Sequence, residues 1–514
     1  MKSSKNQIKI GSMLSYIQIF INTVVSLLYT PFMIASLGKS EYGLYNIASS
    51  SVAMLSVLSL GFNSGYLRYY SKYKAEKDET NVSKLNGLYI IIFSVIGLIA
   101  LICGMFLMVN IRLVFKNGLT EAEYSLARKL MFFIVIDMAI SFPLGVLSHI
   151  ISAHERFIFL KTVGMIKSIL NPLLVLPLLL MGYKSITLVT VSLLLTISTY
   201  CIHGYYVFKV LDCKFIFHNF PKGIFWEIFS YTGFVALNLF VRQFNGNIDR
   251  IILGRYVGTT EVAIYTVGHS VFSYYHSFSS AIANVFGPYI HRIANSTKDK
   301  AILRKEFTEV FVKVARIQFL ILTLICSGFI FFGRKFIELW VGSDFDRAYY
   351  VAVILLVSVT VPYTQNIGIE IQRSQVLHRF RSIAYSIMAI FNFTISVYLC
   401  QFLGAIGCTI GTAVSWLFAN VIMMNTYYHK KCNIDIWAYW KNIIKICRGL
   451  IIPVLVGVAY KRLFDCTKTM FWAIGIVMYT VVYCCSMWMF SLNEYEKNMI
   501  LKPLKTVTSK FRTK

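Results

Sequence analysis

Charged residues are scarce in this chain, and acidic residues are the scarcest of them. Only 14% of the 514 residues are charged, and 23 Asp and Glu stand against 50 Lys and Arg. A soluble domain carries about a quarter of its residues as charged ones to cover its surface. With 57% hydrophobic residues and a mean hydropathy of +0.64, the composition excludes an ordinary soluble protein and predicts an integral membrane protein.

Sequence motifs for covalent chemistry are also missing. The chain has no G-x-x-x-x-G-K-[ST], no H-E-x-x-H and no G-x-S-x-G, so P-loop ATP hydrolysis, zinc-dependent proteolysis and serine-dependent hydrolysis are not expected. The 11 cysteines are scattered, and they form neither a disulfide framework nor a C-x-x-C metal pattern. We therefore expect a transporter rather than an enzyme, without a metal and without an organic cofactor.

Long apolar runs take up most of the chain. A helix needs about 20 apolar residues to cross the hydrocarbon layer, and the alternation typical of a β-barrel is absent. We therefore expect an all-α integral membrane fold of about fourteen transmembrane helices. The expected spans are 13–35, 42–62, 85–108, 127–148, 158–181, 185–207, 224–247, 263–288, 314–332, 348–370, 382–402, 405–427, 447–463 and 470–492.

The basic residues gather in alternate connections between the expected spans. Clusters lie before the first span, between 68 and 84, between 292 and 313, between 430 and 448, and from 497 to the end of the chain. Cytoplasmic loops carry an excess of Lys and Arg, so this distribution places both termini in the cytoplasm. Topology and contact with anionic lipid account for the net charge of +27, and no nucleic acid partner is expected.

Two stretches, 38–45 and 258–265, share a Gly-x-x-Glu-x-x-x-Tyr pattern. Other residues recur at nearly the same offset: Pro143 and Pro362, Asn171 and Asn392, and Gly182 and Gly404. Spans one to six therefore match spans seven to twelve, and an even number of helices per copy gives both copies the same orientation in the membrane. The domains we expect are a six-helix bundle over 1–218, a second over 219–430, two extra helices over 431–492 and a basic cytoplasmic tail over 493–514.

Polar side chains form stripes along three of the expected spans. Residues spaced by three or four positions share one helical face. The stripes are Asn238, Arg242, Asn245 and Asp249 in the seventh span, Gln18, Asn22 and Tyr29 in the first, and His269 and His276 in the eighth. Hydrogen bonding between helices is the simpler explanation for the neutral members, but a charge within a span indicates function by default, and Arg242 favours a cavity. We predict that the two half-bundles line one central cavity with these faces.

Four further charges lie in or near the expected spans. Lys167 either extends to the cytoplasmic surface or faces the cavity, and Arg68 either sets topology or lies at the cavity mouth. Arg316 is expected to extend to the surface from near the start of its helix. Asp137 is either a partner for a cation such as Lys167 or a site for a proton or cation.

Several short motifs, in their order along the chain, resemble those of one transporter family. They are 37–45, 59–69, 247–254, 337–342 and 404–412. Together with the expected spans, they cover nearly the whole chain. The chain resembles the Wzx-type flippases of O-antigen and capsule repeat units, within the multidrug/oligosaccharidyl-lipid/polysaccharide exporter superfamily.

This resemblance implies a flippase of the bacterial inner membrane. Such a protein moves undecaprenyl-diphosphate-linked oligosaccharide from the cytoplasmic to the periplasmic leaflet by alternating access, and a polysaccharide polymerase and other assembly proteins are its implied partners. The diphosphate needs cations and the sugars need hydrogen-bonding groups. The expected substrate-binding residues are therefore Arg242, Asn238, Asn245, Asp249, Gln18, Asn22, Tyr29, Arg68, Lys167, His269 and His276, with Asp137 as the candidate for coupling to H⁺ or Na⁺.

Two alternatives stay open within the same superfamily. One is a flippase for a lipid-linked peptidoglycan precursor, and the other is a cation-coupled multidrug antiporter. The predicted cavity has more basic than acidic residues, which argues against the antiporter, because cationic drugs need acidic partners. The Glu41-Tyr42-Gly43 motif favours the repeat-unit type over the peptidoglycan type.

Overall fold

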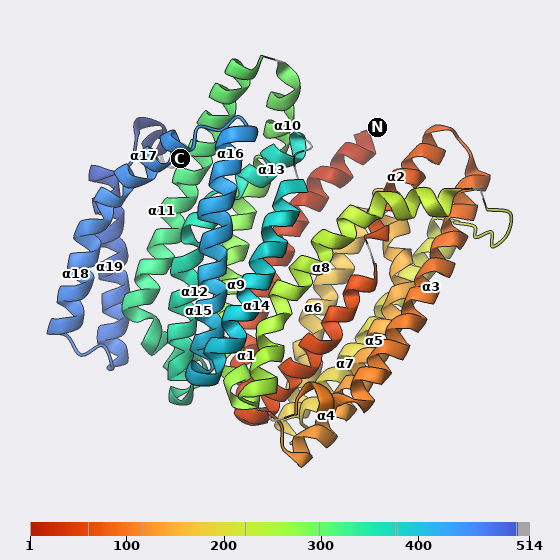
Figure 1. Ribbon diagram of the computed structural model, residues 1–514, viewed down its shortest axis with the longest axis horizontal. Helices are drawn as coiled ribbons and strands as arrows, with labels where there is room; N and C mark the ends of the chain where they lie inside the picture. The colour runs from red at the N-terminus through yellow and green to blue at the C-terminus, as the bar shows by residue number, and fades with distance from the viewer. Residues whose placement is uncertain are drawn as a thin grey trace, which may run out of the picture. The chain divides into compact units, whose positions relative to one another are not determined.

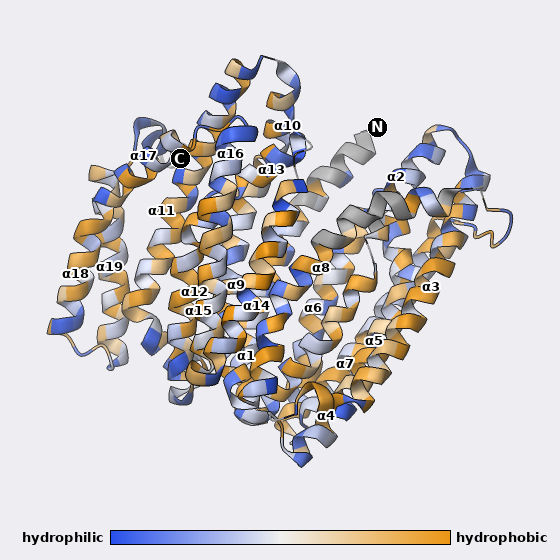
Figure 2. Ribbon diagram, in the orientation of Figure 1, coloured by the Kyte–Doolittle hydropathy of each residue, from blue (hydrophilic) through white to orange (hydrophobic). Residues whose placement is uncertain are grey.

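A computed structural model of the protein describes residues 2–59, 61–116, 118–220, 223–297, 299–375, 377, 379–499 and 501. Within these residues every regular element is a helix (Figure 1). Hydrophobic residues run along the helices of each unit, and hydrophilic residues gather near their ends and in the connections (Figure 2). The all-α membrane fold expected from the sequence is therefore confirmed.

The helices follow one another closely along the chain. The α-helices are α1 (Lys2–Ala53), α2 (Phe62–Ala75), α3 (Glu79–Val109), α4 (Ile111–Val114), α5 (Glu121–Ala153), α6 (Phe157–Leu180), α7 (Ser185–Tyr205), α8 (Ile224–Tyr256), α9 (Thr259–Val285), α10 (Gly287–Ser296), α11 (Lys300–Val341), α12 (Asp346–Thr364), α13 (Ile367–Ser374), α14 (Arg379–Leu403), α15 (Ala405–Leu417), α16 (Asn425–Lys431), α17 (Ile436–Cys447), α18 (Ile451–Leu463) and α19 (Thr469–Phe490). Short 3₁₀ or π segments are η1 (Met54–Ser59), η2 (Tyr206–Val210), η3 (Ser343–Phe345), η4 (Phe418–Met424) and η5 (Arg448–Leu450).

In the described part of the chain, 11 helical segments are long and apolar enough to cross a membrane. The first of them, Met13–Ser59, is 47 residues long and is divided by non-helical backbone at Gly38, so it contains two helices. The polar-striped helices α8 and α9, with 33 and 27 residues, also exceed the length of about 20 that a membrane crossing needs. The total of fourteen spans stays a prediction.

The four glycines of the repeated turns all have left-handed backbone. Their φ angles are +74° at Gly38, +123° at Gly258, +91° at Gly182 and +59° at Gly404. Residues with a side chain rarely adopt this conformation, whereas glycine does so at little cost. All four glycines therefore lie where the backbone turns, at positions that recur in the repeated sequence pattern.

The chain divides into two compact units. Unit 1 consists of Met1–Thr266 with Ala389–Gly411, and unit 2 of Val267–Met388 with Thr412–Lys514. The boundaries between the units fall within α9, α14 and α15. The predicted bundle limits near 219 and 430 follow the sequence repeat and stay a prediction.

Each unit has an aromatic-rich core. In unit 1, the rings of Tyr66 and Tyr89 lie 5.0 Å apart and both side chains are fully buried. In unit 2, the ring of Phe311 packs against that of Tyr439 at 5.4 Å. Close packing of such large rings gains van der Waals contact and helps to hold the helices of each unit together.

The structure corrects the expectation for Arg316. Its side chain does not extend to the surface, because Arg316 is only 5% exposed and Glu496 only 3%. The two form a bidentate ion pair with distances of 2.6 and 2.8 Å. The segment after α19 folds back against α11 and brings Glu496 to the guanidinium, a contact between residues 180 positions apart that no local pattern predicts.

Candidate functional site

The two glutamates of the repeated motif, Glu41 and Glu261, make equivalent hydrogen bonds in unit 1. Ser185, the first residue of α7, donates its backbone N–H to Glu41 Oε1 at 2.8 Å and its hydroxyl at 2.5 Å. Ala405, the first residue of α15, donates its backbone N–H to Glu261 Oε2 at 2.7 Å. Each carboxylate satisfies an otherwise unpaired N–H at a helix N-terminus. Both donor–acceptor pairs are separated by 144 residues, so the repeat extends to side-chain contacts.

A polar junction joins the two copies of the motif, also within unit 1. Glu123 Oε1 accepts hydrogen bonds from the hydroxyls of Ser40 at 2.5 Å and Thr259 at 2.8 Å. A side chain at Gly43 would collide with the Thr259 carbonyl oxygen, and one at Gly118 with a carbonyl oxygen near the end of α8. The backbones at the start of α9 and the end of α8 therefore lie directly against the first repeat. We call the five residues Glu123, Ser40, Thr259, Gly43 and Gly118 the motif junction.

Three helices of the first repeat bring a buried acid and a lysine together. Lys167 of α6 donates from Nζ to Thr196 Oγ1 of α7 at 2.9 Å. Thr196 also lies beside the carboxylate of Asp137 on α5, and the charges of Asp137 and Lys167 are close enough to influence each other. No direct ion pair joins them in the described residues, and Asp137 Oδ1 is buried without a hydrogen-bond partner. Lys167 thus contacts the middle of α7 and does not extend to the surface.

The second repeat holds another buried carboxylate, Asp249 of α8. Asp249 is 2% exposed and accepts hydrogen bonds from Tyr265 OH at 2.7 Å and from Asn392 Nδ2 at 3.4 Å. Ser396 in turn donates to Asn392 Oδ1 at 2.9 Å. These contacts enclose Asp249 between α8, α9 and α14, so its carboxylate is not open on the polar face predicted for the seventh span.

The remaining members of the first and seventh stripes lie on α1 and α8, which contact each other within unit 1. Arg242 and Asn22 are exposed, and Gln18 and Asn245 are half-buried. Tyr29 OH and Asn245 Oδ1 are buried without a hydrogen-bond partner. The side chain of Asn238 lies outside the described residues. The described polar residues of α1 and α8 therefore lie on helices that pack together in unit 1, with Asp249 turned inward, and their role in lining a cavity stays a prediction.

Other predicted residues are placed separately. Arg68 is exposed at α2. In unit 2, His269 contacts Ser273 of its own helix, with 3.4 Å between Nδ1 and Oγ. His276 contacts Ser280 at 3.3 Å and lies 5.0 Å from the Tyr363 ring, centroid to centroid. Both histidines thus contact neighbours within unit 2.

Sequence reasoning missed two arginines with unusual surroundings. Arg381, at the start of α14, donates to Tyr385 OH at 2.5 Å and lies 4.7 Å from its ring centroid, and its other terminal nitrogen is buried without a partner. Arg250 of α8 donates to Thr266 at 3.2 Å and Ser50 at 3.5 Å. Both arginines stand next to basic or apolar runs that indicate topology, so only their surroundings in the fold distinguish them.

Comparisons with known proteins are consistent with this architecture. The family model described as "Polysaccharide biosynthesis protein" matches residues 10–294, more than half of the chain. A search of curated proteins finds no match.

Solved transporters share the fold. A structure described as lipid II flippase MurJ in an inward closed conformation is similar with a TM-score of 0.71 and 17% identity, covering 94% of this chain and 98% of that one. A structure of the MATE multidrug transporter DinF-BH gives a TM-score of 0.56 and 15% identity, over 83% of this chain and 96% of that one. A MATE transporter in complex with MaD5 gives 0.54 and 16%, over 82% and 94%. At these identities the likeness shows the fold alone.

Proposed function

We propose, from the premise that this chain belongs to the polysaccharide biosynthesis protein family, that it moves a lipid-linked oligosaccharide across the bacterial inner membrane. The substrate is an undecaprenyl-diphosphate-linked oligosaccharide destined for surface polysaccharide such as O-antigen or capsule. Movement is from the cytoplasmic to the periplasmic leaflet, both termini are cytoplasmic, and a polymerase consumes the product. The protein is a multi-pass membrane transporter and not an enzyme.

The observation that carries this proposal is a set of cations that, among the described residues, have no carboxylate in direct contact. Lys167 hydrogen bonds to a threonine and Arg381 to a tyrosine, and Arg242 is exposed on α8. Placing a cation within a membrane-spanning helix without an anion is costly, so such groups mark sites where an anion arrives. A diphosphate supplies that anion, and arginine binds phosphate oxygens through paired N–H donors.

Alternating access requires the two repeats to separate where they now touch. The motif junction is one such contact, because Glu123 binds Ser40 of the first repeat and Thr259 of the second. A carboxylate with two hydroxyl donors can exchange them for water at small cost. We propose that this junction opens when the substrate is released.

The transport test uses a strain from which the gene is deleted, with export restored by plasmid-borne variants. We expect lipid-linked oligosaccharide to accumulate on the cytoplasmic face of the deletion strain, and Arg242→Ala to leave export at a tenth of normal or less, a loss of about 1.4 kcal/mol. Arg242→Lys should restore part of it. Exposed Arg462→Ala on α18 is the matched control and should export normally. Full export by Arg242→Ala would remove Arg242 from the mechanism.

We further propose that H⁺ or Na⁺ exchange drives transport through Asp137. Its buried oxygen without a partner and its closeness to Lys167 support a group that gains and loses a cation. Asp137→Asn should abolish transport driven by an ion gradient in proteoliposomes while leaving substrate binding intact. Transport by the wild-type protein at the same rate with and without an H⁺ or Na⁺ gradient would eliminate this coupling.

The two alternatives are separated by the same deletion strain. A peptidoglycan-precursor flippase has support from the fold shared with the lipid II flippase structure, and its loss would stop cell-wall synthesis and kill the cell. A multidrug antiporter has support from the fold shared with the MATE structures, and its loss would raise drug sensitivity without accumulation of any lipid-linked sugar.

A further inference from the structure

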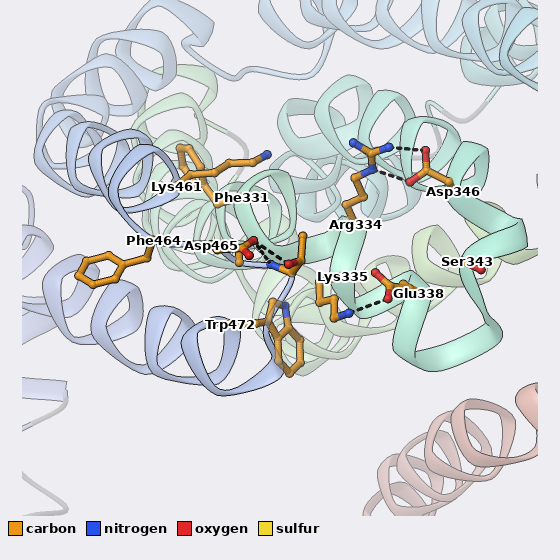
Figure 3. Close-up of a pocket in the computed structure, with 12 residues that line it drawn as sticks. Phe331, Arg334, Lys335, Glu338, Ser343, Asp346, Lys461, Phe464, Asp465 and Trp472 are labelled. Carbon is orange, nitrogen blue, oxygen red and sulfur yellow. Dashed lines mark hydrogen bonds and ion pairs between the residues drawn. The ribbon is translucent and has the colours of Figure 1, made fainter.

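A polar pocket lies in unit 2 where α11 ends and α18 turns into α19 (Figure 3). Its volume is about 680 Å³. The charged residues that line it are Arg334, Lys335 and Lys461 on the basic side and Glu338, Asp346 and Asp465 on the acidic side. The pocket therefore carries no net charge, although both signs are present.

Most of these charges are already paired with each other. Arg334 binds Asp346 with distances of 2.5 and 2.8 Å, and Lys335 binds Glu338 at 2.6 Å (Figure 3). One oxygen of Asp465 accepts hydrogen bonds from the Thr467 hydroxyl and backbone N–H. In the described part of the chain, the Lys461 ammonium has neither an ion pair nor a hydrogen bond. One ammonium and one carboxylate oxygen are thus left for a ligand.

An apolar groove continues from this pocket between α11 and α19. Its volume is about 270 Å³. Trp472 lines both spaces and donates from its indole nitrogen to the Phe332 carbonyl at 2.9 Å. The groove has an open floor at Gly328, where an added Cβ would meet no atom within 4 Å. Tryptophan is typical of the membrane interface, so it marks the level at which the polar pocket gives way to hydrocarbon.

The groove has the length of one lipid chain. Along α11 its lining runs from Leu324 to Phe336, which is about 18 Å at 1.5 Å per residue. One leaflet contributes about half of the 30 Å hydrocarbon core. An acyl chain that starts at the interface therefore fits the groove along its whole length.

We propose that the pocket and groove bind one glycerophospholipid whose headgroup carries both a phosphate and a primary ammonium. The acyl chain lies in the groove, the phosphate meets Lys461, and the ammonium binds the remaining Asp465 oxygen, in a pocket that the carboxylates of Glu338 and Asp346 also line. A purely anionic headgroup would meet these carboxylates at close range, which disfavours it. A quaternary headgroup has no N–H to donate to them. This lipid site is separate from the residues proposed above for the oligosaccharide.

The test is native mass spectrometry of the purified, delipidated full chain with phosphatidylethanolamine, phosphatidylglycerol and phosphatidylcholine of identical acyl chains. We expect one phosphatidylethanolamine to be retained in preference to the other two. Gly328→Leu fills the groove, and Lys461→Gln removes the free ammonium from an exposed position where folding is not at risk, so each should weaken retention about tenfold. Ala473→Leu, exposed on α19 outside the groove, is the matched control and should bind as the wild type does.

Three results would overturn the proposal. One is a wild-type protein that retains no phosphatidylethanolamine, and another is equal or better retention of phosphatidylglycerol or phosphatidylcholine. The third is retention by Lys461→Gln that equals the wild type. An unchanged melting temperature of both variants in lipid-free detergent confirms that any loss concerns the lipid and not the fold.

Discussion

At the scale of single residues, the surroundings of a charge decide what it does. Arg316, well inside α11, has a buried carboxylate partner, whereas Arg381, at the start of α14, has a tyrosine. A paired, buried charge holds the fold, and breaking such a pair leaves the other charge unpaired in a poor solvent. A cation with neutral partners lacks a local counter-charge, which is the basis of the anion-binding role proposed above.

The ion pair of Arg316 and Glu496 gives a stability prediction. Glu496→Ala should destabilise the protein by about 3–5 kcal/mol, because the guanidinium stays buried without its partner. The melting temperature in detergent measures the loss. Arg112→Ala breaks an exposed pair with Glu121 and should cost about 1 kcal/mol or less. Equal shifts for the two variants would show that burial of Glu496 does not matter.

At the scale of helices, the two repeats share one long-range contact. In each, a glutamate that follows a glycine turn binds the first residue of a helix 144 positions further along the chain. The glutamate that follows Gly38 binds the first residue of α7, and the glutamate that follows Gly258 binds the first residue of α15. Glu41 thereby holds the N-terminus of α7 against α1, and Glu261 holds the N-terminus of α15 against α9. The two repeats thus share a hydrogen bond at a helix N-terminus as well as a sequence pattern.

Removal of either carboxylate should have similar effects. Glu41→Ala and Glu261→Ala should each cost about 1–2 kcal/mol, since each leaves a helix N-terminus without its acceptor. Melting temperatures and faster hydrogen exchange at Ser185 and Ala405 are the readouts. Glu→Gln at either position keeps an acceptor and should lose less. A large effect at one site and none at the other would contradict the equivalence of the repeats.

At the scale of the whole molecule, alternating access requires contacts between the two repeats that can break and form again. The motif junction uses hydroxyl–carboxylate hydrogen bonds and close backbone contacts, which are weaker than the aromatic cores that hold each unit together. Opening at such a contact therefore costs less than unpacking a core.

A reversible cross-link tests this role. The hydroxyl oxygens of Ser40 and Thr259 lie 3.2 Å apart, so Ser40→Cys with Thr259→Cys, in a chain whose native cysteines are replaced, should form a disulfide on oxidation. Export should fall at least tenfold when the bond forms and return on reduction. Each single cysteine variant is the control. Normal export by the oxidised double variant would show that the junction does not open.

The amino-acid sequence was sufficient to predict the helical membrane fold and the glycine turns, because apolar runs need burial in lipid and left-handed turns need glycine. It also placed polar residues on helix faces, since helical spacing follows from sequence position alone. The folded structure was needed to identify their partners. It enclosed Asp249 with Tyr265 and Asn392, brought Lys167 to Thr196 beside Asp137, and paired Arg316 with Glu496. The physical reason is that periodicity gives the direction of a side chain, whereas its partner depends on which distant helix packs against it.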